Sequence, residues 1–399
     1  MFLTKKQEKM LEGDMGEVIS KNMKLIVKLG EINEAKKLIP IKSAQIAGVS
    51  YFTVGEAIFS FFNLFSKENV KVKVPSWLNP AGMDRKNWEK MGITERFAEK
   101  QFQIIQKYEE MGVESTLTCT PYLIGYQPNY GEHLAWSESS AVVMANSFFG
   151  ARTNREGGPS ALAAALTGFT AEYGFHLTEK RQPTIKVNVE TNLDTLADFS
   201  ALGYWYGKNF HGETPFITGL SQLSINEAKM LSSAIAASGS VTLFHAKNLS
   251  PESEIISLDN IKEKIIFSES EKQSVYDCFT QKDTNFDIVV IGCPHASLTE
   301  LVIIHSSLKD KVLKKNLKFW VFTSQKVSNS KKFKPIQRCL EKKGIEIFTD
   351  TCMVVSPIVR TKYKHILTNS AKASKYLSNS KQTKVTFRSL HHILRNVTE

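Results

Sequence analysis

Several features that are missing from this 399-residue sequence exclude whole classes of protein. The opening residues, MFLTKKQEKMLEGD, contain no apolar stretch of the kind that a secretory signal requires, so none is expected. A long hydrophobic run is also missing, because the most apolar window, residues 46–65, is interrupted by Glu56, Gly48 and Gly55. We therefore expect a cytoplasmic protein without a membrane span.

Cysteine is scarce: the sequence has five, widely spaced along the chain. This pattern, without a signal peptide, argues against a disulfide framework and favours metal ligation or free thiols. Internal repeats, low-complexity segments and a clear interdomain linker are absent too. A chain of this length exceeds one simple core, so we expect two or three domains, with tentative subdomains at 1–130, 131–280 and 281–399.

Acidic residues are outnumbered by basic ones, which gives a formal net charge of +11. The lysines are densest between Lys309 and Lys343, and such an excess favours an anionic ligand or partner. The basic residues are not interleaved with aromatic ones as in a groove that binds single strands, so nucleic acid is only a minor alternative.

What the sequence does contain is an alternation of helical and strand-like segments. A capping box from Thr4 to Gln7 predicts a helix that runs to about Leu29. Apolar periodicity predicts further helices over 94–111, 136–149, 160–168, 196–209 and 226–238, and strands over 39–46, 70–74, 184–189 and 241–245.

The last third is more regular. Strands are expected over 286–292, 319–323, 346–349 and 365–368, with helices over 297–308, 334–343 and 371–377 between and after them. Such βαβ units form parallel sheets with right-handed crossovers, so the fold class is α/β.

The positions of the cysteines in this pattern suggest a shared site. Cys293 and Cys352 follow two strands of the predicted parallel sheet, and ligands gather outside the carboxyl ends of such strands. Cys119 is expected to follow a short strand as well. These three could hold an iron–sulfur cluster with one open iron, or zinc with a water, or could be unligated buried thiols. Cys278 and Cys339 fall within predicted helices and are interpreted as structural or exposed thiols.

The stretch 116–158 is unusually rich in polar groups interleaved with aromatic residues, which predicts a buried polar site rather than a hinge between domains. Within it, Arg152 and Arg155 could clamp an anion in bidentate fashion. The alternative is a buried ion pair with Glu138 or Glu156.

Two loops that precede predicted helices, 48–50 and 369–370, could bind anions through free backbone N–H groups, and ordinary helix capping is the alternative. Among the histidines, His295 is best placed for a functional role, because it lies two residues after Cys293.

These residues resemble the aconitase X family. The run CTPYLIGYQPNYGEHLAWSESSAVVMANSFFGARTNREGGPSALAAAL is similar to that family's signature, and IGCPHAS, DTCMVVSP and TNSAKASKY follow in the family's order. The resemblance spans residues 3–376. It implies an aconitase-like fold of three α/β subdomains, with parallel or mixed sheets around a central iron–sulfur site. It also implies that Cys119, Cys293 and Cys352 hold a 4Fe-4S cluster with one open iron.

The resemblance further implies a hydro-lyase large subunit whose swivelling small domain is a separate chain, in a heterodimer or higher heteromer. Family members dehydrate cis-3-hydroxy-L-proline or, in archaea, mevalonate 5-phosphate. Ser43-Ala44-Gln45 and Ser139-Ser140 are similar to the archaeal type. We therefore expect dehydration of (R)-5-phosphomevalonate to trans-anhydromevalonate 5-phosphate, in the modified mevalonate pathway of isoprenoid biosynthesis. The alternatives are hydroxyproline dehydration and, in another class, an iron-sensing protein that binds nucleic acid.

By the same resemblance, the substrate is expected to contact Gly48, Val49, Ser50, Asn79, Pro80, Ser139, Asn369 and Ser370. The base that removes the proton is usually a serine of the small subunit in this superfamily, and Glu138, His295 and Lys372 are the alternatives on this chain.

Overall fold

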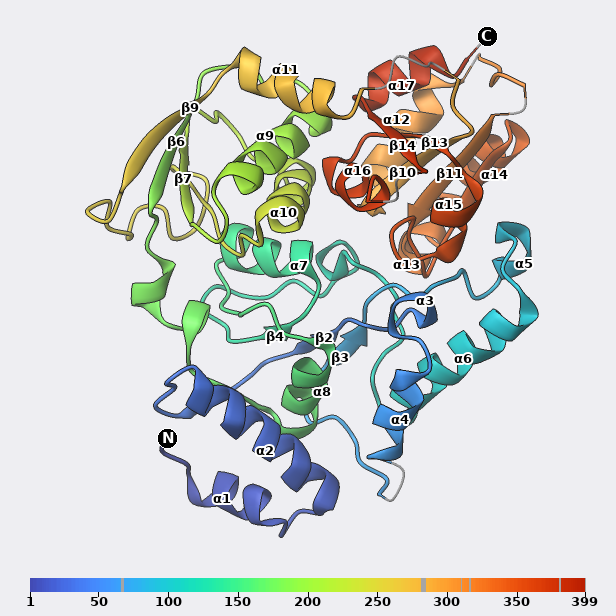
Figure 1. Cartoon of the computed structure of the whole chain (residues 1–399). Coiled ribbons are helices and arrows are strands. Elements are labelled where there is room, and N and C mark those ends of the chain that lie inside the picture. The colour runs from blue at the N-terminus through green and yellow to red at the C-terminus, as the bar shows by residue number, and fades with distance from the viewer. Residues whose placement is uncertain (66–67, 281–284, 310, 316, 380–381, 399) are drawn as a thin grey trace.

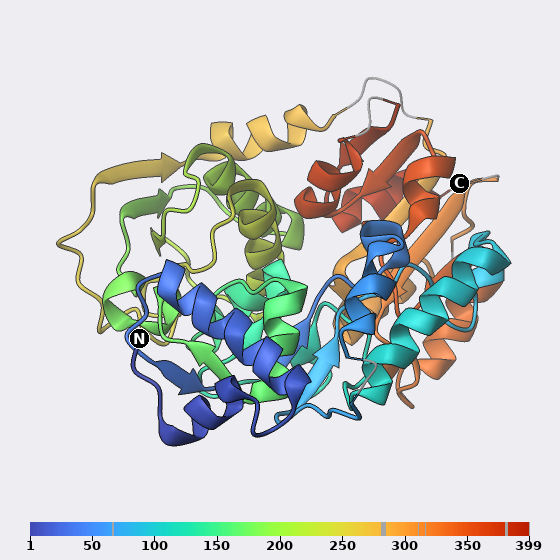
Figure 2. The same ribbon diagram turned by 60° about the horizontal axis from the view of Figure 1, so that its bottom comes forward.

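Hydrophobic strands alternate with helices along most of the chain, and the computed structural model arranges them in three α/β units (Figure 1). It describes residues 1–65, 68–280, 285–309, 311–315, 317–379 and 382–398. The second and third units lie side by side, with the first unit across their base (Figures 1 and 2). Within those ranges no helix is long and apolar enough to cross a membrane. The predicted α/β class is confirmed.

The first unit contains a three-stranded parallel sheet in the order β3-β2-β4 and an antiparallel pair, β1 with β5. Small residues let α8 pack closely on α2 and β2. The elements are α1 (Lys5–Glu12), α2 (Glu17–Ile32), β1 (Leu38–Pro40), β2 (Ala44–Ile46), α3 (Tyr51–Val54), α4 (Ala57–Asn63), β3 (Ser76–Leu78), α5 (Trp88–Met91), α6 (Glu95–Glu110), η1 (Pro121–Leu123), β4 (Ala135–Trp136), α7 (Ser139–Val143), η2 (Met144–Phe148), α8 (Gly158–Thr167) and β5 (Phe169–Ala171).

The second unit has a parallel sheet in the order β8-β7-β6-β9, covered by the packed helices α9 and α10. These helices approach closely because their contact carries glycine, and a Cβ at Gly203 would lie 2.5 Å from the carbonyl oxygen of Leu231. The elements are η3 (Gly174–His176), η4 (Thr178–Arg181), β6 (Ile185–Val189), α9 (Leu196–Asn209), β7 (Pro215–Thr218), α10 (Ile225–Gly239), β8 (His245–Ala246), β9 (Glu263–Phe267) and α11 (Glu269–Cys278).

The third unit is a five-stranded parallel sheet in the order β12-β11-β10-β13-β14, which confirms the parallel sheet predicted for the last third. Its helix α16 also contacts α9 and α10 of the second unit. The elements are β10 (Ile288–Ala296), α12 (Leu298–Ser307), β11 (Lys318–Thr323), α13 (Gln325–Ser328), α14 (Lys334–Lys342), β12 (Ile345–Phe348), α15 (Pro357–Lys362), β13 (His365–Thr368), α16 (Ala371–Leu377), β14 (Lys384–Phe387) and α17 (Leu390–Asn396).

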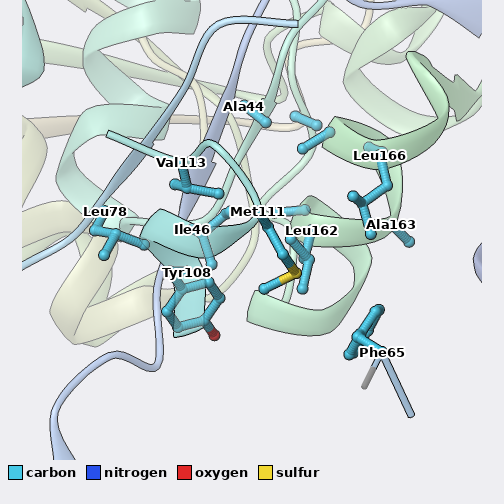
Figure 3. Close-up of a cluster of buried hydrophobic side chains, with 14 of the residues drawn as sticks. Ala44, Ile46, Phe65, Leu78, Tyr108, Met111, Val113, Leu162, Ala163 and Leu166 are labelled. Atoms are coloured by element: carbon cyan, nitrogen blue, oxygen red, sulfur yellow. The ribbon is translucent and has the colours of Figure 1, made fainter. Parts of the chain in front are cut away.

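The core of the first unit shows why its short strands are stable. Ile46 and Leu78 of adjacent strands are fully buried and pack with Tyr108 of α6 and Leu162 of α8 (Figure 3). Burying such side chains stabilises the fold by about 1.5–3 kcal/mol each. This packing holds the carboxyl ends of β2 and β3 in place.

Some predicted elements differ from the structure. The helix predicted from Thr4 to Leu29 is two helices, because Gly13 and Gly16 adopt φ of +103° and +101°, which a continuing helix does not allow. The strand predicted over 39–46 is likewise two short strands, β1 and β2, which belong to different sheets. Residues 70–74 are not a strand, and the nearest strand is β3.

Three further differences lie near the polar stretch. The helix predicted from Trp136 starts only at Ser139, because Trp136 belongs to β4 and Glu138 caps α7. The strand expected over 241–245 is reduced to β8. Cys119 follows an irregular loop, where the preceding segment makes a single bridge between Trp77 and Glu114.

Strand β4 pairs with β2, so the first sheet extends beyond residue 130, where a tentative subdomain boundary was expected. The other tentative boundary, at 280–281, adjoins residues 281–284, which lie outside the described ranges. The division into 1–130, 131–280 and 281–399 stays a prediction.

Candidate active site

Two parallel sheets direct their carboxyl ends at one cavity of about 240 Å³. From the first unit, Ala47, Asn79 and Ser137 line the cavity directly after β2, β3 and β4. From the third unit come Cys293, at the break in pairing between β10 and β11, and Cys352, in the loop after β12. This is where open parallel sheets place their ligands.

All three cysteines predicted as ligands line this cavity and are free and buried. Cys278 and Cys339, which were interpreted as structural or exposed thiols, are exposed. Among the described residues, no group of three or more His, Cys, Asp or Glu side chains could hold a metal ion.

Polar groups of the protein act on each of the three sulfur atoms. The Cys119 sulfur accepts a hydrogen bond from the backbone N–H of His295 at 3.3 Å, the Ser370 hydroxyl favours the thiolate of Cys293, and the backbone N–H groups of Val354 and Val355 favour that of Cys352. Such donors stabilise thiolates bound to metal. Burial raises the pKa of each of these thiols, that of Cys293 to about 12, so a nearby cation is needed to deprotonate them at neutral pH. The donor set therefore fits a thiolate-bound metal group.

A buried ion pair forms one wall of the cavity. The ammonium group of Lys372 on α16 lies 2.5 Å from Oε1 of Glu138, which caps α7, and 3.2 Å from the Ser139 hydroxyl. The other carboxylate oxygen accepts hydrogen bonds from Ser140 at 2.6 Å and the N–H of Ala141 at 2.7 Å. Both side chains are thereby fixed in charged form.

Burial acts against charge on both members of this pair, but their interaction outweighs it. Burial raises the pKa of Glu138, but Lys372 and the hydrogen bonds from Ser140 and Ala141 lower this pKa by more, so the net shift is downward. Burial likewise lowers the pKa of Lys372, but the Glu138 carboxylate and Cys293 raise it above its usual value. The cavity thus holds a positive charge close to its thiols.

Asn79, Pro80 and Ser139, which were predicted to bind substrate, line the cavity. The side-chain oxygen of Asn79 is buried and has no hydrogen-bond partner among the described residues. An unpaired buried acceptor is costly, so it suits a ligand hydroxyl or a water. Sequence reasoning missed Tyr376, which lines the cavity one helical turn after Lys372. Their i, i+4 spacing on α16 was the signal that could have found it.

The two predicted anion loops adjoin the cavity without lining it. Ser50 precedes the four-residue helix α3 and donates its hydroxyl to the carbonyl of Val355 at 2.7 Å. Ser370 is buried and caps α16 by accepting from the N–H of Ala373 at 3.1 Å, while it also contacts Cys293. Val49 and Asn369 are buried and Gly48 is exposed, and none of the three lines the cavity.

The structure separates the two arginines that were predicted to clamp an anion. Arg155 is exposed and lines the cavity. Arg152 faces away, where its guanidinium donates to the carbonyl of His176 at 3.0 Å and lies 3.6 Å from the Glu252 carboxylate. The paired clamp is therefore not formed.

The alternative partners of those arginines are engaged elsewhere. Glu138 pairs with Lys372, and Glu156 accepts hydrogen bonds from Ser160 at 2.5 Å and Thr170 at 3.3 Å. The predicted ion pair of Arg152 or Arg155 with Glu138 or Glu156 is not among the described contacts.

His295, a candidate base, is fully buried and does not line the cavity. Its Nδ1 lies 2.9 Å from the Thr118 hydroxyl and its Nε2 lies 2.8 Å from the carbonyl oxygen of Thr351. Burial lowers its pKa to about 4, so the ring is neutral. Both nitrogens are engaged, which leaves neither directed at a substrate.

A larger cavity, of about 460 Å³, lies beside α4 and α6. Its lining within the described residues is made of Phe62, Asn63, Phe65, Glu68, Asn69, Val70, Lys71, Lys107, Glu110 and Met111. None of these was predicted as a site residue, and no cysteine or histidine is among them.

Fold and site together define a three-unit α/β protein whose parallel sheets gather buried thiols and a Lys–Glu pair in one cleft. Family models for the first, second and third domains of aconitase X match residues 1–179, 183–277 and 286–399. The chain belongs to the aconitase X family, which confirms the resemblance seen in the sequence.

Several known proteins are similar to this chain over most of its length. The phosphomevalonate dehydratase large subunit of Methanocaldococcus jannaschii is 44% identical, over 99% of this chain and 100% of that protein. The one from Methanosarcina mazei is 45% identical, over 94% and 92%. A cis-3-hydroxy-L-proline dehydratase of Pseudomonas aeruginosa is 29% identical, over 92% of this chain and 65% of that protein. A crystal structure of Thermococcus kodakaraensis aconitase X (holo-form) superposes with a TM-score of 0.92, at 39% identity and full coverage of both chains.

Proposed function

We propose that this chain is the large subunit of an iron–sulfur hydro-lyase that dehydrates (R)-5-phosphomevalonate to trans-anhydromevalonate 5-phosphate. The observation that carries the reaction class is the cavity lined by three buried thiols, next to protein groups that favour their thiolates. The substrate follows from the archaeal relatives, which match at higher identity and over more of their length than the hydroxyproline dehydratase does.

Cys119, Cys293 and Cys352 are proposed to hold a 4Fe-4S cluster. Three buried thiols in one cavity suit three of the four irons of such a cluster, and zinc bound by the same thiolates is the alternative. When bound by these three cysteines, the cluster would supply an iron without a protein ligand as a Lewis acid for the C–O bond of the substrate's tertiary hydroxyl.

The residues around the thiols are proposed to bind and orient the substrate. Arg155, at the exposed side of the cavity, suits the phosphate, because a guanidinium pairs with phosphate in bidentate fashion. Lys372 and the unpaired acceptor of Asn79 suit the carboxylate and a hydroxyl group. Fixing both ends of the substrate aligns the C–H and C–O bonds that break.

The reaction removes one proton from the carbon beside the carboxylate and the hydroxyl from the tertiary carbon, so one water leaves and one double bond forms. Both Glu138 oxygens accept hydrogen bonds from the protein, and the His295 nitrogens are engaged away from the cavity. Lys372 is the hydrogen-bond donor to Glu138. These contacts favour a base from the partner chain, a small subunit whose existence the name "large subunit" of the relatives implies.

The test is anaerobic coproduction of this chain with a small swivelling-domain subunit. Iron and sulfide content and the EPR spectrum report the cluster, and proton NMR follows phosphomevalonate for a new vinylic proton. We expect turnover only with both chains present, and its loss with the cluster in Cys119→Ala. Cys278→Ala, which changes an exposed cysteine, is the matched control and should keep both.

Consumption of cis-3-hydroxy-L-proline with no reaction of phosphomevalonate would replace the substrate but keep the reaction class. Full turnover by the large chain alone would contradict the proposed origin of the base.

A further inference from the structure

His295 contacts all three cysteine loops at once. It lies two residues after Cys293 in β10, and its backbone N–H donates to the sulfur of Cys119 at 3.3 Å. Its ring reaches Thr118, the residue before Cys119, at 2.9 Å, and the carbonyl of Thr351, the residue before Cys352, at 2.8 Å.

The partners of the ring determine its tautomer. A carbonyl oxygen can only accept, so Nε2 carries the hydrogen and donates to Thr351. Nδ1 is then the acceptor and the Thr118 hydroxyl is its donor. The same hydroxyl also accepts from the N–H of Thr120 at 3.2 Å, so the ring is continuous with the loop around Cys119.

The backbone of His295 is anchored from a third direction. Its carbonyl accepts a hydrogen bond at 3.1 Å from Lys229, which lies fully buried on α10 of the second unit. Lys229 in turn forms an ion pair with Glu300 of α12. The histidine is therefore held by the first, second and third units together.

We infer that His295 is a positioning residue that holds the three thiol-bearing loops in one mutual arrangement. The inference rests on the proposed function in that the thiols are cluster ligands, and it assigns His295 no contact with the substrate. Removal of a group that hydrogen-bonds to a metal ligand commonly lowers metal affinity by about 10- to 100-fold. The backbone N–H of His295 joins the Cys293 loop to the Cys119 sulfur, and its ring adds one hydrogen bond to the loop of Cys119 and one to the loop of Cys352.

The first test uses the chain without a cluster, so it needs no activity. Alkylation of each cysteine by iodoacetamide is followed by mass spectrometry, with exposed Cys278 and Cys339 as internal standards. In His295→Ala we expect faster alkylation of Cys119 and Cys352 as well as Cys293. An increase confined to Cys293 would overturn the inference, because it would show a purely local role.

Two further variants keep the test decisive if His295→Ala fails to fold. Thr118→Val removes the donor to Nδ1 and the acceptor of the Thr120 N–H, both of which serve the Cys119 loop, so alkylation of Cys119 should rise and that of Cys352 should not. His295→Gln retains an amide that can donate to Thr351 and should recover part of the protection. The matched control is His245→Gln, since His245 is equally buried but bonds Arg181 in the second unit. It should leave the three thiols protected.

The second test uses the cluster-loaded complex. We expect His295→Ala to lose iron to a chelator about 10- to 100-fold faster than the wild type, with His295→Gln in between. Equal rates for wild type and His295→Ala would also overturn the inference. If the wild type binds no cluster, the proposed function fails, while the alkylation pattern still decides the positioning role.

Discussion

At the scale of single residues, the ion pair between Lys372 and Glu138 dominates the electrostatics of the cavity. Both side chains are almost fully buried, and the distance between their charged atoms is 2.5 Å. A buried pair adds little stability relative to a neutral packed pair, but loss of one member leaves an uncompensated charge. The pair therefore places both charges in the cavity wall and adds little to the stability of the fold.

Removing one member of this pair should be costly. We expect Lys372→Met to reduce the free energy of unfolding of the cluster-free chain by about 3–5 kcal/mol, because Glu138 is left buried and unpaired. The double variant Lys372→Met/Glu138→Gln should recover much of this loss. Urea denaturation followed by circular dichroism measures both.

The control for these two variants is Lys262→Met, which removes one member of the exposed ion pair between Lys262 and Glu213. It should change stability by at most about 1 kcal/mol. Equal losses for Lys262→Met and Lys372→Met would contradict the argument from burial.

A second pair of residues makes stability depend on pH. His133 and His176 face each other with 3.0 Å between their Nδ1 atoms, and His176 is buried. Burial, followed by His133 and Arg181, lowers the pKa of His176 to about 3. The unfolded chain, with an ordinary histidine pKa of about 6.5, therefore binds the proton first as pH falls.

Because the unfolded state binds more protons between these two pKa values, the contribution of His176 to stability is full above about pH 6.5 and falls with pH. From pH 7 to pH 5 the loss from this one group is about 2 kcal/mol. We expect His176→Gln to show a smaller loss than the wild type over that range, measured by urea denaturation at each pH. If the free energy of unfolding fell equally with pH in the two proteins, His176 would not be the source of this pH dependence.

At the scale of secondary structure, the end of β10 is the element that places Cys293. Gly292 adopts φ of +103°, and a Cβ there would lie 2.0 Å from the carbonyl oxygen of Phe322 in β11. The regular pairing of β10 with β11 is interrupted after Ile291. Glycine is required because it allows both the left-handed backbone and the close approach of β11.

We expect Gly292→Ala to reduce the free energy of unfolding by about 3 kcal/mol or more, since it adds backbone strain and a steric clash. Gly212→Ala is the matched control, because Gly212 has φ of +72° but open space around its Cβ position. It should cost only about 1–2 kcal/mol. Thermal denaturation measures the loss of stability in both variants. An equal loss in Gly212→Ala and Gly292→Ala would contradict the proposed clash with Phe322.

At the scale of the whole molecule, the proposed cluster joins two units. Cys119 belongs to the first unit, whereas Cys293 and Cys352 belong to the third. A group that binds the folded arrangement and not the unfolded chain stabilises it by mass action. Ligation across the units should therefore couple their unfolding.

We expect anaerobic reconstitution to raise the thermal midpoint by roughly 2–4 °C for each kcal/mol of ligation free energy. Removal of the cluster by oxidation and chelation should reverse the rise. Calorimetry on the wild type and on Cys119→Ala tests the coupling. The same rise in Cys119→Ala as in the wild type would mean that the group does not link the two units.

The sequence by itself determined several of the elements and the gathering of the three cysteines in one cavity. Helices α9, α16 and strand β13 lie at their predicted bounds, because apolar periodicity and capping are local properties of the chain. Short strands such as β4 and β8 were not predictable, because two residues carry no period and their pairing depends on distant partners.

Only the tertiary structure decided how the polar residues are paired. Lys372 and Glu138 are 234 positions apart, and His295 meets Thr118 across 177 positions, so no local pattern indicates either contact. The same holds for Arg152, which lies beside Glu252 and so does not join Arg155 in binding an anion. The alternation of strands and helices predicted a parallel sheet, and this placed the cysteines at its carboxyl edge. The side-chain hydrogen bonds, by contrast, depend on which helix faces enter the cavity once the three units have packed.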